Sequence, residues 1–189
     1  MPKLKLLILD SGVVIRLHEL GIWEQVHDRC DIHLSRIVAE REILFQPGDE
    51  GKYGEDIDLS SDIRGGKVHV FDVATSELEA FRKQFDPLYF GDLDDGEAES
   101  LAYMTGQPPG YLISSGDAIV FRVLGNLGRG DEGLSLEEVL QRIGLGRELD
   151  WPYSKAFREK YTKDGETDMI QGKGQSTPHR FLSIAGRGC

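Results

Sequence analysis

Leu6-Leu7-Ile8-Leu9-Asp10-Ser11-Gly12-Val13-Val14-Ile15 is the stretch that decides the fold. The short, nearly unbroken apolar run at its start is typical of a buried strand in a parallel sheet. The strand ends at Asp10, and the ligands of open α/β sheets bind beyond the carboxyl ends of the strands. Asp10 therefore lies where a catalytic or metal-binding acid is expected. An N-cap for the following helix is an equally good interpretation, since aspartate is a favoured N-cap residue.

Apolar runs and helical patterns alternate along the chain after this strand. Their order predicts an α/β fold, a three-layer α/β/α sandwich with a central, mostly parallel sheet. Further strands are predicted at residues 31–34, 67–71 and 111–114, and helices at residues 13–22, 23–29, 37–45, 76–85, 94–104, 118–126 and 135–143.

We expect one domain over residues 1–145, followed over residues 146–189 by a C-terminal helical extension and tail. Within the domain, residues 46–66 are rich in Gly, Asp and Ser and show no apolar period, which predicts a long surface loop. The extension has a helical pattern at residues 153–161. Residues 165–189 offer little apolar surface to bury, so a tail of uncertain order is expected there.

The composition excludes several classes of protein. A formal net charge of -11 argues against a generic nucleic-acid-binding surface. The two cysteines, Cys30 and Cys189, have no CxxC-type spacing, so the sequence does not predict a structural zinc site. The five histidines show no ligand spacing either, and structural roles are expected for them. No apolar run approaches the ~20 residues of a membrane span and no secretory signal is present, so we expect a cytoplasmic protein without a membrane partner.

Acidic residues follow or begin several of the predicted elements. Asp10 ends the first predicted strand. Glu40 lies in the predicted helix at 37–45, and Glu97 lies in the first turn of the predicted helix at 94–104. Asp117 comes after the strand at 111–114 and is preceded by Ser115. In an open α/β sheet these positions are compatible with convergence on one edge. The competing interpretation is structural, because acids at a helix N-terminus stabilise it by ~0.3–1 kcal/mol each.

Four carboxylates in one pocket repel one another unless a cation lies among them. Ligation by oxygen alone selects the hard cations Mg²⁺ or Mn²⁺. Such a site suits the hydrolysis of a phosphodiester, because a bound cation lowers the pKa of the attacking water and stabilises charge on the leaving oxygen. The hydroxyl of Ser115 would support an acid or a metal-bound water. The chain has no P-loop, GxGxxG, HExxH or GxSxG motif that would predict a rival chemistry.

Four stretches carry a resemblance to the PIN-domain ribonucleases, a family that includes toxins of toxin–antitoxin pairs. The opening stretch Leu7-Ile8-Leu9-Asp10-Ser11-Gly12-Val13-Val14-Ile15 is similar to that family's first strand and first acid. The most specific match is Leu93-Asp94-Asp95-Gly96-Glu97-Ala98-Glu99-Ser100-Leu101-Ala102, which resembles the L-D-x-G-E-A-E version of a PIN-like subgroup. The other two are Ser35-Arg36-Ile37-Val38-Ala39-Glu40, like the helix of the second acid, and Leu112-Ile113-Ser114-Ser115-Gly116-Asp117, like the last strand and final acid. The resemblance covers about residues 4–127.

The resemblance implies a metal-dependent endoribonuclease that cleaves RNA through a Mg²⁺ or Mn²⁺ site. It also implies an RNA substrate, a possible antitoxin protein as partner, and a possible homodimer. Carried over by position, the metal ligands would be Asp10, Glu40, Glu97 and Asp117, with Ser115 as a supporting catalytic residue. Asp94 and Glu99 are alternatives for the third acid, and Glu42 is an alternative for the second.

Two other functions stay open from the sequence. One is a catalytically inactive PIN-like interaction module in which the acids only cap helices. The other is a haloacid-dehalogenase-like phosphatase with Asp10 as nucleophile. That chemistry requires a second aspartate two residues after the first, where this chain has Gly12. If RNA is bound, its phosphates need local basic residues. The candidates are Arg36, Arg41, Arg122, Arg129 and the basic C-terminal part.

Overall fold

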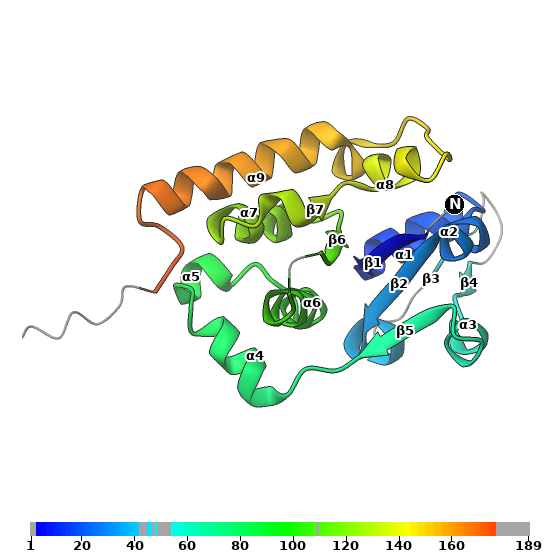
Figure 1. Cartoon of the computed structure of the whole chain (residues 1–189), viewed down its shortest axis with the longest axis horizontal. Coiled ribbons are helices and arrows are strands. Elements are labelled where there is room, and N and C mark those ends of the chain that lie inside the picture. The colour runs from blue at the N-terminus through cyan, green and yellow to red at the C-terminus, as the bar shows by residue number, and fades with distance from the viewer. Residues whose placement is uncertain (1–2, 42–44, 47, 49–53, 109, 177–189) are drawn as a thin grey trace, which may run out of the picture.

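The structure of the chain is a computed structural model that describes residues 3–41, 45–46, 48, 54–108 and 110–176. Five parallel strands form its central sheet, in the order β5-β2-β1-β6-β7, with helices on both faces (Figure 1). This confirms the predicted α/β fold and three-layer arrangement. The strands are β1 (Leu4–Leu9), β2 (Cys30–Ser35), β5 (Val68–Phe71), β6 (Leu112–Ser114) and β7 (Gly133–Leu134).

Most helices agree with the apolar periodicity of the sequence, and those at residues 23–29 and 118–126 agree to the residue. The helix predicted at residues 37–45 is wrong in part, because residues 37–41 form a π-helical turn and Phe45 begins a short strand. The α-helices are α1 (Ser11–Glu19), α2 (Trp23–Arg29), α3 (Ser60–Arg64), α4 (Thr75–Arg82), α5 (Pro87–Phe90), α6 (Asp95–Gly106), α7 (Ala118–Asn126), α8 (Leu136–Arg142) and α9 (Lys155–Ile170). Shorter turns are the π-helix η1 (Ile37–Arg41) and the 3-10 helices η2 (Gly130–Glu132) and η3 (Trp151–Tyr153).

The order of the strands places a topological switch point at the centre of the sheet. From β1 the chain builds outward through β2 and β5, and it then returns to the other side of β1 to add β6 and β7. Connections on the two sides of β1 therefore run in opposite directions. In open α/β sheets, ligands bind outside the carboxyl ends of the two strands at such a point. In this fold those strands are β1 and β6.

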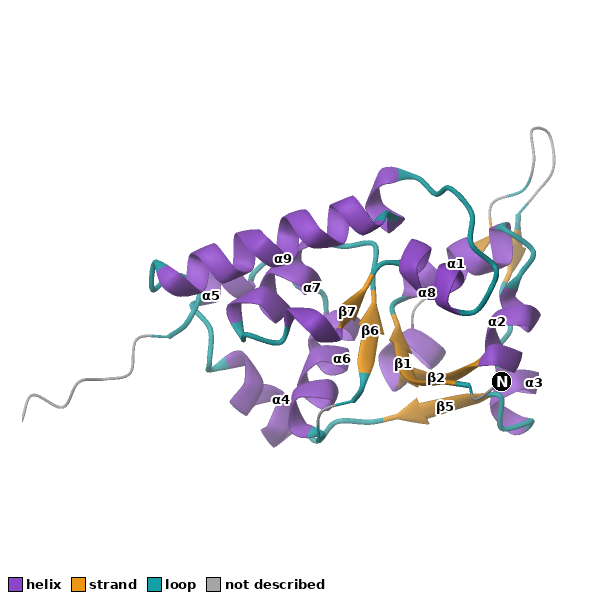
Figure 2. Cartoon of the chain, turned by 45° about the horizontal axis from the view of Figure 1, so that its top comes forward, coloured by secondary structure: helices purple, strands orange, loops and turns teal. Residues whose placement is uncertain are grey.

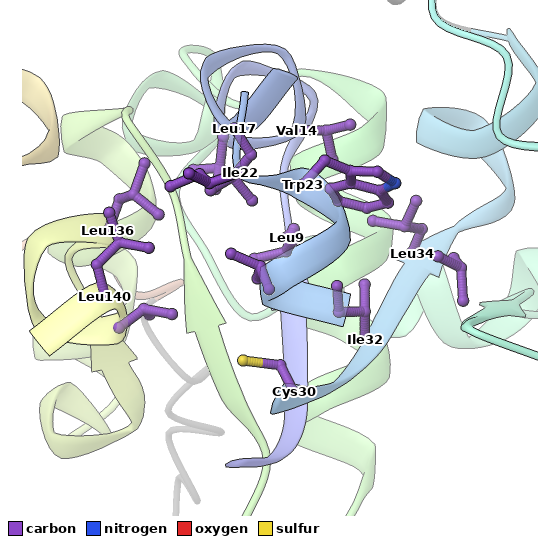
Figure 3. Packing of buried hydrophobic residues seen from close by; sticks show 14 of the residues in the cluster. Leu9, Val14, Leu17, Ile22, Trp23, Cys30, Ile32, Leu34, Leu136 and Leu140 are labelled. Carbon is purple, nitrogen blue, oxygen red and sulfur yellow. The ribbon is translucent and has the colours of Figure 1, made fainter. Parts of the chain in front are cut away.

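The sheet separates two hydrophobic cores. One face packs against α1, α2 and α8, and Figure 3 shows Leu17 of α1, Trp23 of α2 and Leu140 of α8 gathered over Leu9 and its neighbours. The opposite face packs against α4, α6, α7 and α9. Leu9 packs in the first core and its neighbour Ile8 in the second, because successive side chains of a strand point to opposite faces. β1 is thus buried on both sides, as its unbroken apolar run predicts.

The region expected to be one long loop contains short regular elements. β3 (Phe45–Gln46) and β4 (Glu55–Asp56) pair antiparallel in a separate two-stranded sheet, and α3 follows. Two-residue strands and a five-residue helix are too short to give an apolar period, so the sequence did not indicate them. Trp23 contributes to holding α3, because its indole N–H donates to Asp62 at 2.8 Å. Residues 47 and 49–53 lie outside the described part of the chain.

Helix α9 extends beyond the predicted 153–161 and runs alongside α7 in both views (Figures 1 and 2). Two glycines permit the close approach of these helices. A Cβ on Gly125 of α7 would overlap the carbonyl oxygen of Thr162, and a Cβ on Gly165 of α9 would overlap that of Arg122. The expectation of a tail from residue 165 onward is therefore wrong for residues 165–170. Residues 177–189 lie outside the described range.

We predict that Gly165→Ala destabilises the protein by about 1–3 kcal/mol, because the added methyl group forces α7 and α9 apart. This happens although alanine favours an isolated helix by ~1 kcal/mol over glycine. Urea unfolding followed by circular dichroism measures the change. Gly106→Ala is the matched control, since a Cβ at that helical position meets no atom within 4 Å. Equal stability of Gly165→Ala and the unmodified chain would contradict this packing.

Candidate functional site

Asp10 and Asp117 are brought together by the pairing of the two central strands. Leu9, the last residue of β1, lies in register with Ser114, the last residue of β6. The backbone N–H of Asp10 donates to the Ser114 carbonyl at 3.3 Å and extends this pairing by one residue. Both acids therefore lie just beyond the carboxyl ends of the strands at the switch point.

Helix α6 supplies the third acid. Asp94 and Glu97 form a capping box: the Asp94 carboxylate accepts the Glu97 N–H at 2.7 Å, and the Glu97 carboxylate accepts the Asp94 N–H at 3.1 Å. This box fixes where α6 starts and which way Glu97 points. Asp10, Glu97 and Asp117 each offer one carboxylate oxygen, and these three atoms lie within 4.8 Å of one another. We call these three residues the acidic cluster.

Asp10 serves both roles that the sequence suggested for it. One carboxylate oxygen accepts the N–H of Val13 at 2.7 Å and so caps α1. The other accepts the N–H of Gly116 at 3.1 Å, from the turn that follows β6. Asp10 is buried, with 7% of its surface exposed. The cap and the acidic cluster are therefore compatible, and the capping bonds hold the side chain in place.

Burial changes the acidity of two members of the acidic cluster. Burial raises the pKa of Asp10 from 3.8 to about 6, against the opposing effect of hydrogen bonds from Ser115, Val13 and Gly116. Burial also raises the pKa of Glu97, and the negative charges of Asp94, Asp117 and Asp10 raise it further. Without a cation, protons are therefore retained by these acids well above the usual range for carboxyl groups.

The donor atoms of the acidic cluster fit a hard divalent cation. All three are carboxylate oxygens, which Mg²⁺ and Mn²⁺ prefer over nitrogen or sulfur. Glu97 is 5% exposed, and its Oε1 atom has no hydrogen-bond partner among the described residues. A buried polar atom without a partner costs free energy, and a bound cation removes that cost. Asp117 is exposed, so the cluster is open to solvent on its side.

Ser115 supports the acidic cluster from within. It is fully buried, and its hydroxyl oxygen accepts the backbone N–H of Asp117 at 2.9 Å. The same hydroxyl donates to Asp10, which lowers the pKa of that carboxyl group. The predicted supporting residue thus lies between two of the acids, where it orients the turn that carries Asp117.

Glu40, predicted as a fourth ligand, lies apart from the acidic cluster. It is on η1, its side chain is 51% exposed, and it pairs with Arg36 at 2.8 Å. The alternative second acid, Glu42, falls outside the described residues. Glu99, an alternative for the third acid, is buried and accepts the N–H groups of Ile37 and Val73 at 3.3 Å each. Glu99 therefore ties together the segments after β2 and β5.

Sequence reasoning missed Tyr153, which comes from the C-terminal extension. Its hydroxyl donates to the Gly12 carbonyl at 3.3 Å, and its ring packs on Gly116, where a Cβ would come within 3.0 Å of it. These two glycines follow Asp10 and precede Asp117, so Tyr153 forms a wall beside the acidic cluster. Burial and the negative charge of Asp10 raise the pKa of Tyr153. Because Tyr153 and Gly12 are 141 positions apart in the sequence, no local sequence pattern could predict their contact.

The arginines predicted to contact RNA are engaged in ion pairs where their side chains are described. Such pairs do not prevent phosphate binding, but they offset part of the positive charge of these side chains. The side chain of Arg41 is outside the described part. The pairs are Arg36 with Glu40 and Asp72, Arg122 with Asp168, and Arg129 with Glu132.

A comparison of the chain with protein-family models, with curated proteins and with solved structures finds no match. The resemblance to PIN-domain ribonucleases therefore stays a prediction from the four quoted stretches. Among the described residues, no helix has both the length and the apolar character needed to span a bilayer.

We predict that the metal-free protein loses stability as the pH rises from about 4 to about 6. The folded state binds the Asp10 proton more tightly than the unfolded state does, because the pKa is about 6 when folded and 3.8 otherwise. Stability from this group is complete below pH 3.8 and decreases by about 3 kcal/mol as the pH passes through 6. Thermal unfolding in a chelator across this pH range measures the decrease.

Asp10→Asn should reduce this pH dependence, because asparagine still caps α1 but carries no titrating proton. The remainder comes from Glu97, whose pKa is also raised by burial. The matched control is Glu40→Gln, which changes an exposed acid outside the acidic cluster. If Asp10→Asn and Glu40→Gln show the same pH profile as the unmodified chain, the buried acid does not govern it.

Proposed function

We propose that the chain is a nuclease that cleaves RNA phosphodiesters with Mg²⁺ or Mn²⁺ held by Asp10, Glu97 and Asp117. The observation that carries the proposal is the acidic cluster itself: three carboxylate oxygens within 4.8 Å at the switch point of the sheet. The unpartnered Oε1 atom of buried Glu97 adds support. Glu40 pairs with Arg36 outside the acidic cluster and is not among the proposed ligands.

The residues of the chain divide the work at this site. A divalent cation, when bound, activates water for attack on phosphorus and stabilises negative charge on the leaving oxygen. Asp10 is held in a single orientation by two backbone N–H groups, and Glu97 by its capping box. Asp117 is exposed, so a phosphate would approach from its side. Ser115 positions the turn, and Tyr153 packs against Gly116 and contacts the Gly12 carbonyl beside the cluster.

The choice of RNA as substrate rests on the resemblance, since the same three acids would serve any phosphodiester. An antitoxin and a second copy of the chain as partners also rest on the resemblance and stay predictions, as does the cytoplasmic location expected from the sequence. The net charge of -11 adds a constraint, because a negatively charged protein repels a polyanion overall. We expect cleavage to weaken steeply with salt, as phosphate contacts are electrostatic.

The second candidate is an interaction module without catalysis. One observation favours it: Asp10 and Glu97 both have complete structural roles as helix caps, so their presence does not require a cation. Titration calorimetry separates the two functions. An interaction module shows no saturable binding of Mn²⁺ that depends on the acidic cluster.

For the nuclease we predict that Asp10→Asn and Asp117→Asn each lower Mn²⁺-dependent RNA cleavage by at least about 100-fold. The reason is that each removes a cation ligand, and cation stabilisation of the transition state is worth several kcal/mol. The assay follows a fluorescent single-stranded RNA with excess Mn²⁺, and an equivalent DNA tests the substrate class.

Glu40→Gln, purified in the same way, is the matched control and should cleave at the unmodified rate. Its exposed side chain pairs with Arg36 and does not reach the acidic cluster. Equal activity of Asp10→Asn and Glu40→Gln would assign the cleavage to a contaminant and refute the proposed site. Loss of activity in Glu40→Gln would return Glu40 to the site.

A further inference from the structure

Two histidines and an aspartate meet on the outer strands of the sheet, away from the acidic cluster. His33 on β2 and His69 on β5 are register partners, and Asp31 precedes His33 by two residues. Residues two apart on a strand point to the same face, so all three side chains lie together. The intervening residues Ile32 and Leu34 belong to the core on the other face.

The carboxylate of Asp31 lies between the two imidazoles. Its Oδ1 atom is 3.6 Å from Nε2 of His33 and 3.4 Å from Nε2 of His69. Both separations are longer than a good N–H···O hydrogen bond. The Nε2 atom of His33 is buried and has no hydrogen-bond partner among the described residues. The group thus offers three metal-binding atoms that are joined only by long contacts through the Asp31 carboxylate.

These separations match the edge of a tetrahedral zinc site. Ligand atoms about 2.1 Å from Zn²⁺ in a tetrahedral arrangement are about 3.4 Å apart. The two N···O separations are close to this value, whereas the Nε2 atoms of the two imidazoles lie more than 4.8 Å apart and must approach each other for a metal to bind. We propose that Asp31, His33 and His69 bind Zn²⁺, with water as the fourth ligand.

Closing the site requires His69 to rotate. The two imidazole rings are 5.1 Å apart between centroids, and their planes differ by 33°, so they are not yet directed at one point. The His69 side chain is 54% exposed, and its rotation disturbs little packing. His33 is held in place, since the ring of Tyr111 packs edge-on against it at 5.9 Å. His33 is the fixed ligand and His69 the adjustable one.

The chemistry of the ligands favours Zn²⁺ over the cations of the acidic cluster. Imidazole nitrogen suits zinc, whereas Mg²⁺ and Mn²⁺ prefer oxygen. Burial lowers the pKa of His33, which keeps its imidazole in the neutral form that binds a metal. The chain would thus bind Mg²⁺ or Mn²⁺ at the acidic cluster and Zn²⁺ at Asp31, His33 and His69. At the outer site, Zn²⁺ would tie the four-residue edge strand β5 to β2.

Nitrogen-15 NMR of the histidine rings tests the proposal, because the chain has only five histidines. The full chain is titrated with Zn²⁺ in excess Mg²⁺, which occupies the acidic cluster. At one equivalent, we expect the ring signals of His33 and His69 to shift and those of His18 and His27 to stay. His69→Gln should abolish the shift of His33, and Asp31→Asn should weaken Zn²⁺ binding at least about tenfold.

His18→Gln is the control, since His18 stacks on Trp23 and is remote from the three ligands. It should retain the unmodified affinity for Zn²⁺. Amide spectra of each variant report whether the fold is kept, and half-exposed His69 makes His69→Gln the mildest change. The proposal is overturned if Zn²⁺ shifts neither ring, shifts His27 instead, or still shifts His33 in His69→Gln.

Discussion

Three carboxylates held within 4.8 Å of one another at the centre of the sheet edge are the constraint on which the rest of the structure depends. Their repulsion and burial disfavour the charged forms, and the raised pKa of Asp10 corresponds to about 3 kcal/mol. The fold bears this cost because the same oxygens cap helices: Asp10 starts α1, and Glu97 completes the start of α6. One set of bonds therefore fixes two helix starts and the positions of Asp10 and Glu97, whereas the exposed side chain of Asp117 makes no capping bond.

The central part of this arrangement could be predicted from the sequence for a physical reason. β1 is buried on both faces, and its sequence is therefore an unbroken apolar run. The helices α2 and α7 have regular apolar periods. The carboxyl ends of parallel strands meet at one edge, so Asp10 and Asp117 were found from their places after β1 and β6. Glu97 was predicted from its place in the acidic first turn of a helix and from the resemblance carried by residues 93–102, whereas the capping box that orients it was not recognised in the sequence.

Features that depend on tertiary contact could not be predicted. Glu40 follows β2, but the π-helical turn η1 leaves it half exposed beside Arg36. Gly165 looks like a helix break in the sequence, yet it lies inside α9 because it allows contact with α7. Tyr153 reaches the site from far along the chain, and the pairing of His33 with His69 depends on the register of two strands. None of these leaves a local pattern.

Anomalous diffraction from crystals soaked in Mn²⁺ tests the central claim most directly, because it locates the cation without reference to activity. We predict a peak bounded by carboxylate oxygens of Asp10, Glu97 and Asp117 in the unmodified chain, and its loss in Glu97→Gln, which retains the capping box but offers one ligand fewer. A structure of the soaked protein that is well ordered at these residues and lacks the peak would contradict the account. So would a peak that persists undiminished in Glu97→Gln.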